Sequence, residues 1–219
     1  MVEANGFRPK KSQGCFVKRI EGGTQSLGIP LWDYNPLIEF SLNMTMRIDA
    51  AEELTNLFSG SPAKYHSMTV TIITQLEHLS VSRCRWKAET QEELESELAL
   101  VKAVVQDRIL PFFHSHRDLM TIAVAANPEV APMVPPVPNG LTTGMGLLAD
   151  RVLFSSGNHP YRAMSNIALA HLARLPYFDE LIERYRKELG QENEKFEQLI
   201  RYLKERRSSE AYTPGSNEP

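Results

Sequence analysis

The chain has 219 residues, of which 42% are hydrophobic and 23% are charged, and its formal net charge is −3. This composition is typical of a globular protein with its own buried core. It provides no basic field for nucleic acid, no stretch of about 20 apolar residues to span a membrane, and no apolar signal peptide near Met1. We therefore expect a cytoplasmic protein that binds neither nucleic acid nor a membrane.

The first 36 residues predict a helix end, one strand and a loop. Residues 2–7 are typical of the end of a helix, because Asn5 or Gly6 can adopt the left-handed conformation. Almost nothing precedes this segment, so we expect the helix that it would end to be lacking. Residues 10–20 predict a first strand, and residues 27–36, framed by two prolines, predict an irregular loop.

Residues 38–79 predict two strands separated by a short helix. Apolar and polar residues alternate strictly over residues 38–48, which indicates a strand with one buried face and one wet face. Residues 50–58 predict a helix, with Asp49 as a candidate cap. Residues 68–79 are rich in Thr, Val and Ile and predict the next long strand.

The segment Trp86–Leu94 marks the change from strands to helices. Thr90 and Glu93 form the pattern of a capping box, in which each side chain accepts a hydrogen bond from a backbone N–H at the helix start. Beyond it, apolar residues recur every three or four positions and predict one buried helix face: Leu94, Leu98, Val101, Val105, Ile109 and Phe112. Glu92 and Glu93 are a paired set of carboxylates, and capping explains them. Pro111 is expected to end this helix, and a second helix is expected over residues 115–126.

The sequence pattern divides the chain into four parts. Residues 1–127 form a sheet domain with two following helices, and residues 128–140 form a stiff connector with five prolines. Residues 141–207 form a helical part packed on the same domain, with a helix over 160–174 and a hairpin of two helices broken at Gly190. Residues 208–219 are polar and are expected to be a mobile tail.

Several short segments, taken in order, carry a resemblance to a known family. They are Gly6-Phe7-Arg8-Pro9-Lys10, Ile38-Glu39-Phe40-Ser41-Leu42-Asn43, Trp86, Glu92-Glu93-Leu94, Leu110-Pro111-Phe112-Phe113 and Ala168-Leu169-Ala170-His171-Leu172. Together they resemble the bacterial domain-of-unknown-function family 4304. The resemblance implies antiparallel strands, a Glu-rich helix and a terminal helical pair, and it implies no established activity. This chain differs from the family in lacking the first helix and in inserting a loop with Trp32 and Tyr34.

The most metal-like cluster is His114-Ser115-His116-Arg117-Asp118. Two histidines in an extended segment could share a metal, whereas a helical turn would point them apart, and no third ligand is evident nearby. We therefore interpret the histidines as residues near a helix end, and Ser115 with Asp118 as a helix N-cap pair.

No other pattern indicates catalysis or a cofactor. Residues 140–146 are rich in glycine but lack the Gly-Lys-Ser/Thr ending of a phosphate loop, so a flexible loop is expected. Cys15 and Cys84 lie in strand-like runs and are interpreted as buried thiols, because no neighbouring base indicates a nucleophile. The prediction is therefore no catalytic residue, no metal site and no cofactor.

The segment Trp32-Asp33-Tyr34 is the candidate binding site. Aromatic side chains on a proline-framed segment supply a large contact area at low entropic cost, as in interface hot spots. The alternative is that Trp32 closes the end of the core, with the C-terminal helical hairpin folded back in place of the lacking helix.

These observations lead to one fold and two functions. The expected fold is α+β, with an antiparallel sheet of about four strands in the N-terminal part, covered by helices, and a C-terminal helical hairpin. The leading function is a non-enzymatic binding protein that recognises another protein or self-associates, most concretely a bacterial toxin-immunity or accessory protein. The alternative is an enzyme or small-molecule-binding protein, with a pocket between sheet and helices near the Pro-rich connector.

Overall fold

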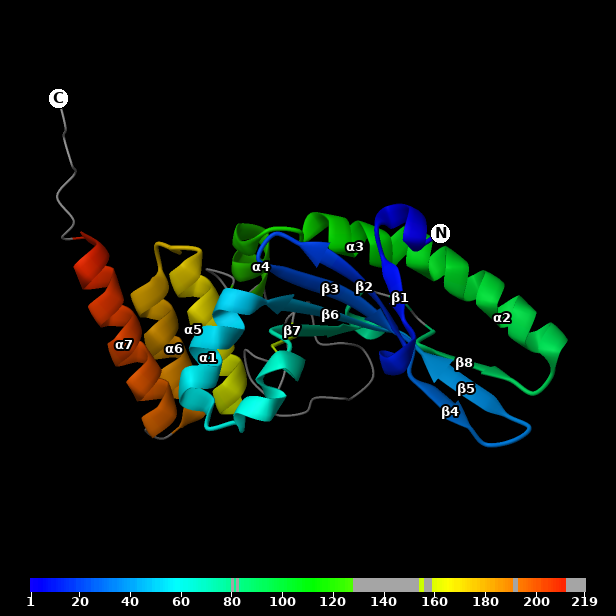
Figure 1. Cartoon of the computed structure of the whole chain (residues 1–219), viewed down its shortest axis with the longest axis horizontal. Helices are drawn as coiled ribbons and strands as arrows, with labels where there is room; N and C mark the ends of the chain where they lie inside the picture. Colours follow the sequence, from blue (N-terminus) through cyan, green and yellow to red (C-terminus); the bar gives the residue numbers. More distant parts are fainter. Residues whose placement is uncertain (80, 82, 128–153, 156–158, 191–192, 212–219) are drawn as a thin grey trace, which may run out of the picture.

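The fold is α+β, as the sequence predicts, and it is described from a computed structural model that covers residues 1–79, 81, 83–127, 154–155, 159–190 and 193–211 (Figure 1). The Pro-rich connector, the glycine-rich stretch 140–146 and residues 212–219 lie outside these residues. Two antiparallel sheets lie side by side. A bundle of helices lies at one end of the molecule, and the smaller sheet lies at the other.

The larger sheet has six strands and is antiparallel throughout. In spatial order they are β1 (Arg8–Lys10), β2 (Cys15–Ile20), β3 (Gly23–Gly28), β6 (Asn43–Ile48), β7 (Ile72–Gln75) and β9 (Phe154–Ser155). The prediction of one strand over residues 10–20 is confirmed for residues 15–20 and wrong for residues 11–14. A 3-10 turn, η2 (Lys11–Gln13), ends at Gly14 with φ of 59° and reverses the chain, so that β1 pairs with β2 as a hairpin.

The N-terminal segment agrees with the predicted helix end. A single 3-10 turn, η1 (Glu3–Asn5), is closed by Gly6, whose φ is 84° and whose N–H donates to the carbonyl of Glu3. A side chain at this φ would be strained, which explains the glycine. Phe7 then points into the core and is 2% exposed.

The smaller sheet contains β4 (Leu31–Asp33), β5 (Ile38–Ser41) and β8 (Arg85–Ala88), in that order. The prediction of an irregular loop over residues 27–36 is therefore wrong in its centre, where β4 pairs with β5. The alternation predicted over residues 38–48 is confirmed, since every second residue from Phe40 to Ile48 is buried. However, the run divides at Leu42 into β5 and β6, which belong to different sheets.

The segment after the alternating strand is more irregular than predicted. Helix α1 (Asp49–Ser59) forms as expected, but Asp49 pairs with Arg47 and does not cap the helix. Residues 68–79 contain a strand only at β7. The 3-10 helices η3 (Ala63–Met68) and η4 (Leu76–Leu79) lie on either side of it.

The long helix after Thr90 continues through Pro111. Helix α2 (Gln91–Val104) passes into a π-helical turn, η5 (Val105–Ile109), and then into α3 (Leu110–Ser115). Proline lacks an N–H and its ring would clash with a carbonyl one turn earlier. In the π-helical turn before Pro111, the N–H of Leu110 donates to the C=O of Val105, five residues earlier in the chain. This wider turn accommodates the proline ring. The prediction that Pro111 ends the helix is therefore wrong.

The remaining helices form the bundle. Helix α4 (Leu119–Ala126) ends at Asn127, as the following proline predicts, and α5 (His159–Leu172) packs on both α1 and α4. The predicted hairpin is confirmed as α6 (Phe178–Leu189) and α7 (Glu194–Ala211), broken at Gly190, whose φ is 71°. Helix α7 continues to Ala211, so the prediction of a mobile tail is wrong for residues 208–211, and the rest of that segment lies outside the described residues.

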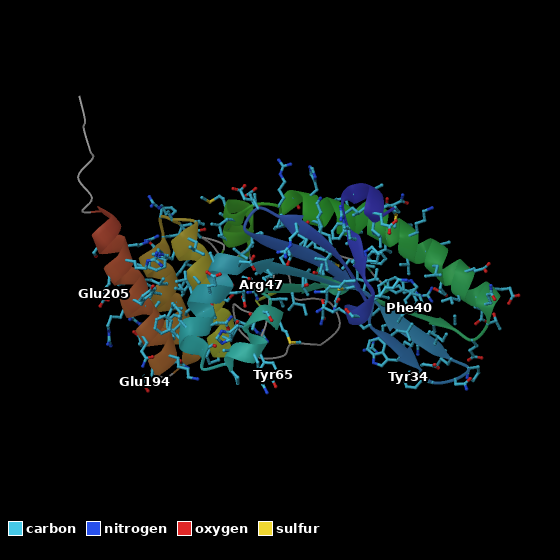
Figure 2. All side chains as sticks on the ribbon, viewed as in Figure 1. Tyr34, Phe40, Arg47, Tyr65, Glu194 and Glu205 are labelled. Atoms are coloured by element: carbon cyan, nitrogen blue, oxygen red, sulfur yellow. The ribbon has the colours of Figure 1, made fainter. Side chains whose placement is uncertain are left out.

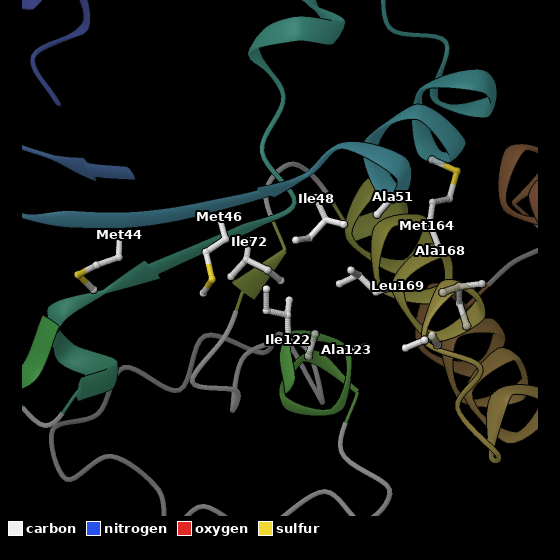
Figure 3. Close-up of a cluster of buried hydrophobic side chains, with 14 of the residues drawn as sticks. Met44, Met46, Ile48, Ala51, Ile72, Ile122, Ala123, Met164, Ala168 and Leu169 are labelled. Atoms are coloured by element: carbon white, nitrogen blue, oxygen red, sulfur yellow. The ribbon is translucent and has the colours of Figure 1, made fainter. Parts of the chain in front are cut away.

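The core lies where the larger sheet meets the bundle (Figure 3). Met46 of β6 and Ile72 of β7 belong to the same buried cluster as Ile122 of α4 and Leu169 of α5, and each of them is at most 1% exposed. The opposite face of β6 carries Thr45 and Arg47, which are half-buried. The predicted pattern of one apolar face and one polar face is thus confirmed for this strand.

Candidate functional site

The strand register gives the smaller sheet two chemically different faces. Leu31, Phe40 and Trp86 lie opposite one another across the three strands and share one face. Phe40 stacks on Trp86 with ring centroids 5.8 Å apart, and the two side chains are 3% and 1% exposed. Helix α2 packs beside β8 on this sheet. We call β4, β5, β8 and residues 91–100 of α2 the small-sheet lobe.

A shallow groove of about 480 Å³ lies between the smaller sheet and α2. Its apolar side chains come from both elements and its polar ones from the start of the helix. The lining residues are Pro36, Ile38, Ala88, Glu89, Thr90, Gln91, Leu94, Glu95 and Leu98. The groove therefore combines an apolar floor with an acidic rim.

The capping box at Thr90 shapes one wall of this groove. Thr90 Oγ1 accepts a hydrogen bond from the N–H of Glu93 over 3.2 Å, which confirms the predicted N-cap. Glu93 Oε2 accepts in return from the N–H of Glu89 over 2.8 Å, one residue earlier than the standard box. Gln91 donates to Glu95 over 3.0 Å, so these two side chains of the rim are joined by a hydrogen bond within the helix start.

The other face of the smaller sheet is built around Glu39, a residue that no sequence motif marked as functional. Arg85 Nη1 and Lys87 Nζ lie 2.9 Å and 3.2 Å from its two carboxylate oxygens. The hydrogen bond from Arg85, and then the one from Lys87, holds the pKa of the Glu39 carboxyl below its usual value. Arg85 also lies over the ring of Trp32, 5.5 Å from the centroid. The only sequence signal for a role of Glu39 was an acidic residue within the alternating pattern of residues 38–48.

The predicted binding residues Trp32, Asp33 and Tyr34 lie together at the outer strand of the lobe. Trp32 is 38% exposed and Tyr34 is 62% exposed, so neither closes the core. Helices α6 and α7 lie at the opposite end of the molecule from Tyr34 (Figure 2). The alternative in which the terminal hairpin covers a buried Trp32 is therefore wrong.

The lobe exposes further large apolar side chains. Leu31 on β4 is 60% exposed, and Leu98 and Leu100 on α2 are 48% and 49% exposed. The helix face predicted to be buried is buried from Val101 to Phe112, whereas in its first half Leu94 is partly buried and Leu98 is exposed. Apolar residues at these spacings are normally covered, so this half of α2 presents a surface available for a partner.

The histidine cluster proves to be a helix end. His116 Nδ1 lies 2.9 Å from the carbonyl of Phe112, and Ser115 Oγ donates back to the same carbonyl. Asp118 caps α4 by accepting from the N–H of Thr121 over 2.9 Å, and this bond lowers the pKa of its carboxyl. The predicted Ser115–Asp118 pair is thus wrong for Ser115. Neither the groove above nor a smaller hollow beside Phe7 is lined by these residues.

A buried polar cluster, which no sequence pattern indicated, joins the sheet to the bundle. Glu52 of α1 is fully buried, and its Oε2 accepts from the hydroxyl of Tyr161 over 2.8 Å. Burial, followed by the negative charge of Glu52, raises the pKa of the Tyr161 hydroxyl. Arg47 Nη1 lies 4.0 Å from Glu52 and donates to the carbonyls of His66 and Thr69. This cluster holds α1, α5 and η3 together.

Two absences apply to the described part of the chain. Within it, His, Cys, Asp and Glu side chains form no group of three or more that could hold a metal ion. None of the helices described there is long and apolar enough to cross a bilayer. Cys15 and Cys84 are not joined in a disulfide, and both are half-buried and not fully buried as predicted.

Comparison with known proteins adds no relative. No family model, no curated protein and no solved structure matches the chain. The resemblance to the domain-of-unknown-function family 4304 therefore stays a prediction.

Proposed function

We propose that this protein is a non-enzymatic, cytoplasmic binding protein that recognises another protein through the small-sheet lobe. A bacterial toxin-immunity or accessory protein is the most concrete form of this function. The observation that carries the proposal is the concentration of exposed apolar side chains on one lobe. Trp32, Tyr34, Leu31 and Leu98 are each between 38% and 62% exposed there.

Physical chemistry explains why such a surface favours association. Large exposed apolar patches with polar rims usually mark interaction sites, and Trp and Tyr contribute most to binding energy at interfaces. Trp32 is already partly ordered by Arg85, which reduces the entropy lost when a partner contacts the ring. The lobe thus offers one aromatic anchor, Trp32, that is partly held in place before binding.

The charges on the lobe indicate the chemistry of the partner. Five glutamates lie between residues 89 and 97, namely Glu89, Glu92, Glu93, Glu95 and Glu97. Arg83 neutralises Glu97, and Glu93 is used in capping, while Glu89 and Glu95 line the groove. Basic side chains of a partner would complement the α2 side of the lobe and would speed association at low salt, whereas the Trp32 side carries the cations Arg85 and Lys87.

The test compares capture of partners by matched tyrosine variants. Tagged wild type, Tyr34→Ala and Tyr65→Ala are used to capture proteins from a lysate of the source organism. Tyr65 lies on η3, outside the lobe, and is 48% exposed, so it controls for the loss of an exposed tyrosine. We expect one protein to be captured by wild type and by Tyr65→Ala and to be lost with Tyr34→Ala. That protein, once purified, should bind at least tenfold more weakly to Tyr34→Ala, which corresponds to about 1.4 kcal/mol.

Two results would contradict the proposal. Either no captured protein depends on Tyr34, or every captured protein is lost equally with both variants. A gene for a toxic protein directly beside this gene would support the immunity form, whereas a neighbouring set of metabolic enzymes would count against it.

The groove allows a test of the alternative function, which is the binding of a small molecule. Its volume of about 480 Å³ lies within the range of small-molecule sites. Under this alternative, a ligand found in a thermal-shift screen would lose its stabilising effect in Leu98→Glu and keep it in Leu57→Glu. The side chain of Leu57 is 65% exposed and that of Leu98 is 48% exposed, but Leu57 lies on α1, outside the lobe. The groove lies between a sheet and a helix, as this alternative requires, whereas the Pro-rich connector near which the pocket was predicted lies outside the described residues.

A further inference from the structure

The outer strand of the small-sheet lobe has a free edge of backbone groups. The N–H of Tyr34 donates to the carbonyl of Leu37 over 2.8 Å, and the N–H of Ser41 donates to the carbonyl of Pro30 over 3.0 Å. Hydrogen-bonded pairs alternate along an antiparallel ladder. Trp32 therefore bonds to Glu39, and the N–H and C=O groups of Leu31 and Asp33 point away from β5.

No described residue pairs with this edge, since β4 is the last strand of its sheet. The edge of the larger sheet is different, because its outer strand β1 reads Arg8-Pro9-Lys10. Natural proteins protect exposed edges with prolines and basic residues of this kind. Leu31-Trp32-Asp33 contains neither a proline nor a basic residue, so the β4 edge lacks the protection that β1 has.

We propose that the β4 edge pairs with β4 of a second copy of this chain, antiparallel and about a two-fold axis at Trp32, which joins the two smaller sheets into one. This inference rests on the proposed recognition function of the lobe and names a second copy as the partner of its edge. The chemistry of the strand itself is self-complementary. With the axis at Trp32, Leu31 of each copy lies opposite Asp33 of the other.

This register satisfies every outward backbone group of the strand. Leu31 N–H donates to the carbonyl of Asp33 in the other copy, and Asp33 N–H donates to the carbonyl of Leu31. The two-fold axis repeats both bonds. No like charges lie opposite each other, because each Asp33 is opposite a leucine.

The side chains on the Trp32 face also complement one another. Trp32 lies opposite Trp32 of the second copy in a non-hydrogen-bonded pair, where Cα atoms are about 4.5 Å apart and side chains are closest. Aromatic pairs at such positions stabilise antiparallel sheets. Tyr34 lies opposite Pro30 of the second copy. Residues 30, 32 and 34 thus form one continuous row across the axis, which accounts for the exposure of both aromatic rings in the single chain.

The first experiment measures the oligomeric state of the full chain by sedimentation velocity over a range of concentrations. A short edge of three residues gives a small interface, so we expect a reversible dimer with Kd between roughly 1 µM and 1 mM. Leu31→Pro removes an outward N–H and no bond to β5, and it should weaken the dimer at least tenfold with an unchanged circular dichroism spectrum. The control Leu57→Lys removes a similarly exposed leucine from α1 and should leave the dimer intact.

The second experiment tests the register and does not depend on the stability of Leu31→Pro. In a Cys15→Ser, Cys84→Ala background, Trp32→Cys should form an intermolecular disulfide on mild oxidation. Its Cα atoms would lie within the 4.4–6.8 Å range that a disulfide allows, at about 4.5 Å. Tyr34→Cys is the matched control, because the two copies of residue 34 would lie roughly 14 Å apart along the strands and should not crosslink.

Two outcomes would overturn the inference. One is a wild-type protein that is monomeric at about 1 mM and a Trp32→Cys variant that crosslinks no faster than Tyr34→Cys. The other is a dimer that Leu31→Pro leaves unchanged. Both outcomes leave the Tyr34-dependent capture of another protein unaffected, so the failure of this inference is distinguishable from the failure of the proposed function.

Discussion

Replacement of Gln25 by leucine should destabilise the protein by about 2–3 kcal/mol. Gln25 is 1% exposed, and its Nε2 donates to the carbonyls of Phe113 and His116, each over 2.8 Å. Phe113 lies in the last turn of α3 and His116 directly follows the helix, where C=O groups lack partners within the helix. One side chain of β3 thus caps the helix that crosses the larger sheet.

The magnitude follows from the surroundings of the two carbonyls. The bond to Phe113 is buried, so its loss leaves an unpaired carbonyl that costs about 1–3 kcal/mol. The bond to His116 is partly buried, so water can replace it and the cost is nearer ~1 kcal/mol. Leucine recovers part of the loss because it fills the same space with apolar atoms.

Urea unfolding followed by far-ultraviolet circular dichroism provides the measurement. A loss of 2–3 kcal/mol corresponds to a decrease in Tm of about 4–12 °C for a chain of this length. Ser26→Ala is the matched control, because Ser26 is the next residue of β3 and its side chain lies on the other face. It should change stability by less than about 0.5 kcal/mol. A Gln25→Leu variant within that margin of wild type would refute the capping role of Gln25.

Three further predictions follow from the described contacts. Thr90→Ala should lower the unfolding free energy measured in urea by about 1 kcal/mol. Thr90→Ser keeps the hydroxyl that accepts from the N–H of Glu93 and should lower it by almost nothing. Equal stabilities of the Thr90→Ala and Thr90→Ser variants would exclude the cap. Arg186 lowers the pKa of the Glu197 carboxyl through hydrogen bonds of 2.7 Å and 2.6 Å. The stability that this pair contributes is present above the pKa of the unfolded-state carboxyl and is lost as pH falls through the lowered pKa of the folded state. The unfolding free energy of Arg186→Gln should therefore be lower than that of wild type at pH 7, and the two should converge in acid. A constant difference in unfolding free energy across this pH range would contradict the assignment. Elemental analysis of the purified protein should find no stoichiometric zinc, nickel or iron, and one metal per chain that is lost in His116→Ala would overturn the helix-end interpretation.

The features that the sequence predicted well are those determined by neighbouring residues. The Thr90 cap, the break at Gly190 and the alternation from Phe40 to Ile48 depend on contacts within a few positions of the chain. The division of residues 38–48 between two sheets could not be predicted, because it depends on β8 pairing with β5 and on β3 pairing with β6. The alternation of apolar and polar residues indicates which face of a strand is buried, but it does not indicate which strand pairs with that strand.

The candidate site shows the same division. The exposed aromatic character of Trp32 and Tyr34 was predicted from a proline-framed segment, but their position on a strand was not, since β4 exists only through its pairing with β5. Gln25 gave no signal, because its partners lie 88 and 91 residues away in the chain. The π-helical turn before Pro111 was also missed, because the pattern rule treats a proline as a stop and not as a cause of local widening.

The position of Phe40 against Trp86 has a spectroscopic consequence. The chain has two tryptophans, and both Trp32 and Trp86 lie in the smaller sheet, whereas the described helices of the bundle carry tyrosines. Intrinsic tryptophan emission therefore reports the smaller sheet alone, while far-ultraviolet circular dichroism is dominated by the helices. Unfolding curves from the two signals would coincide if sheet and bundle unfold as one cooperative unit, and would separate if the smaller sheet opens first.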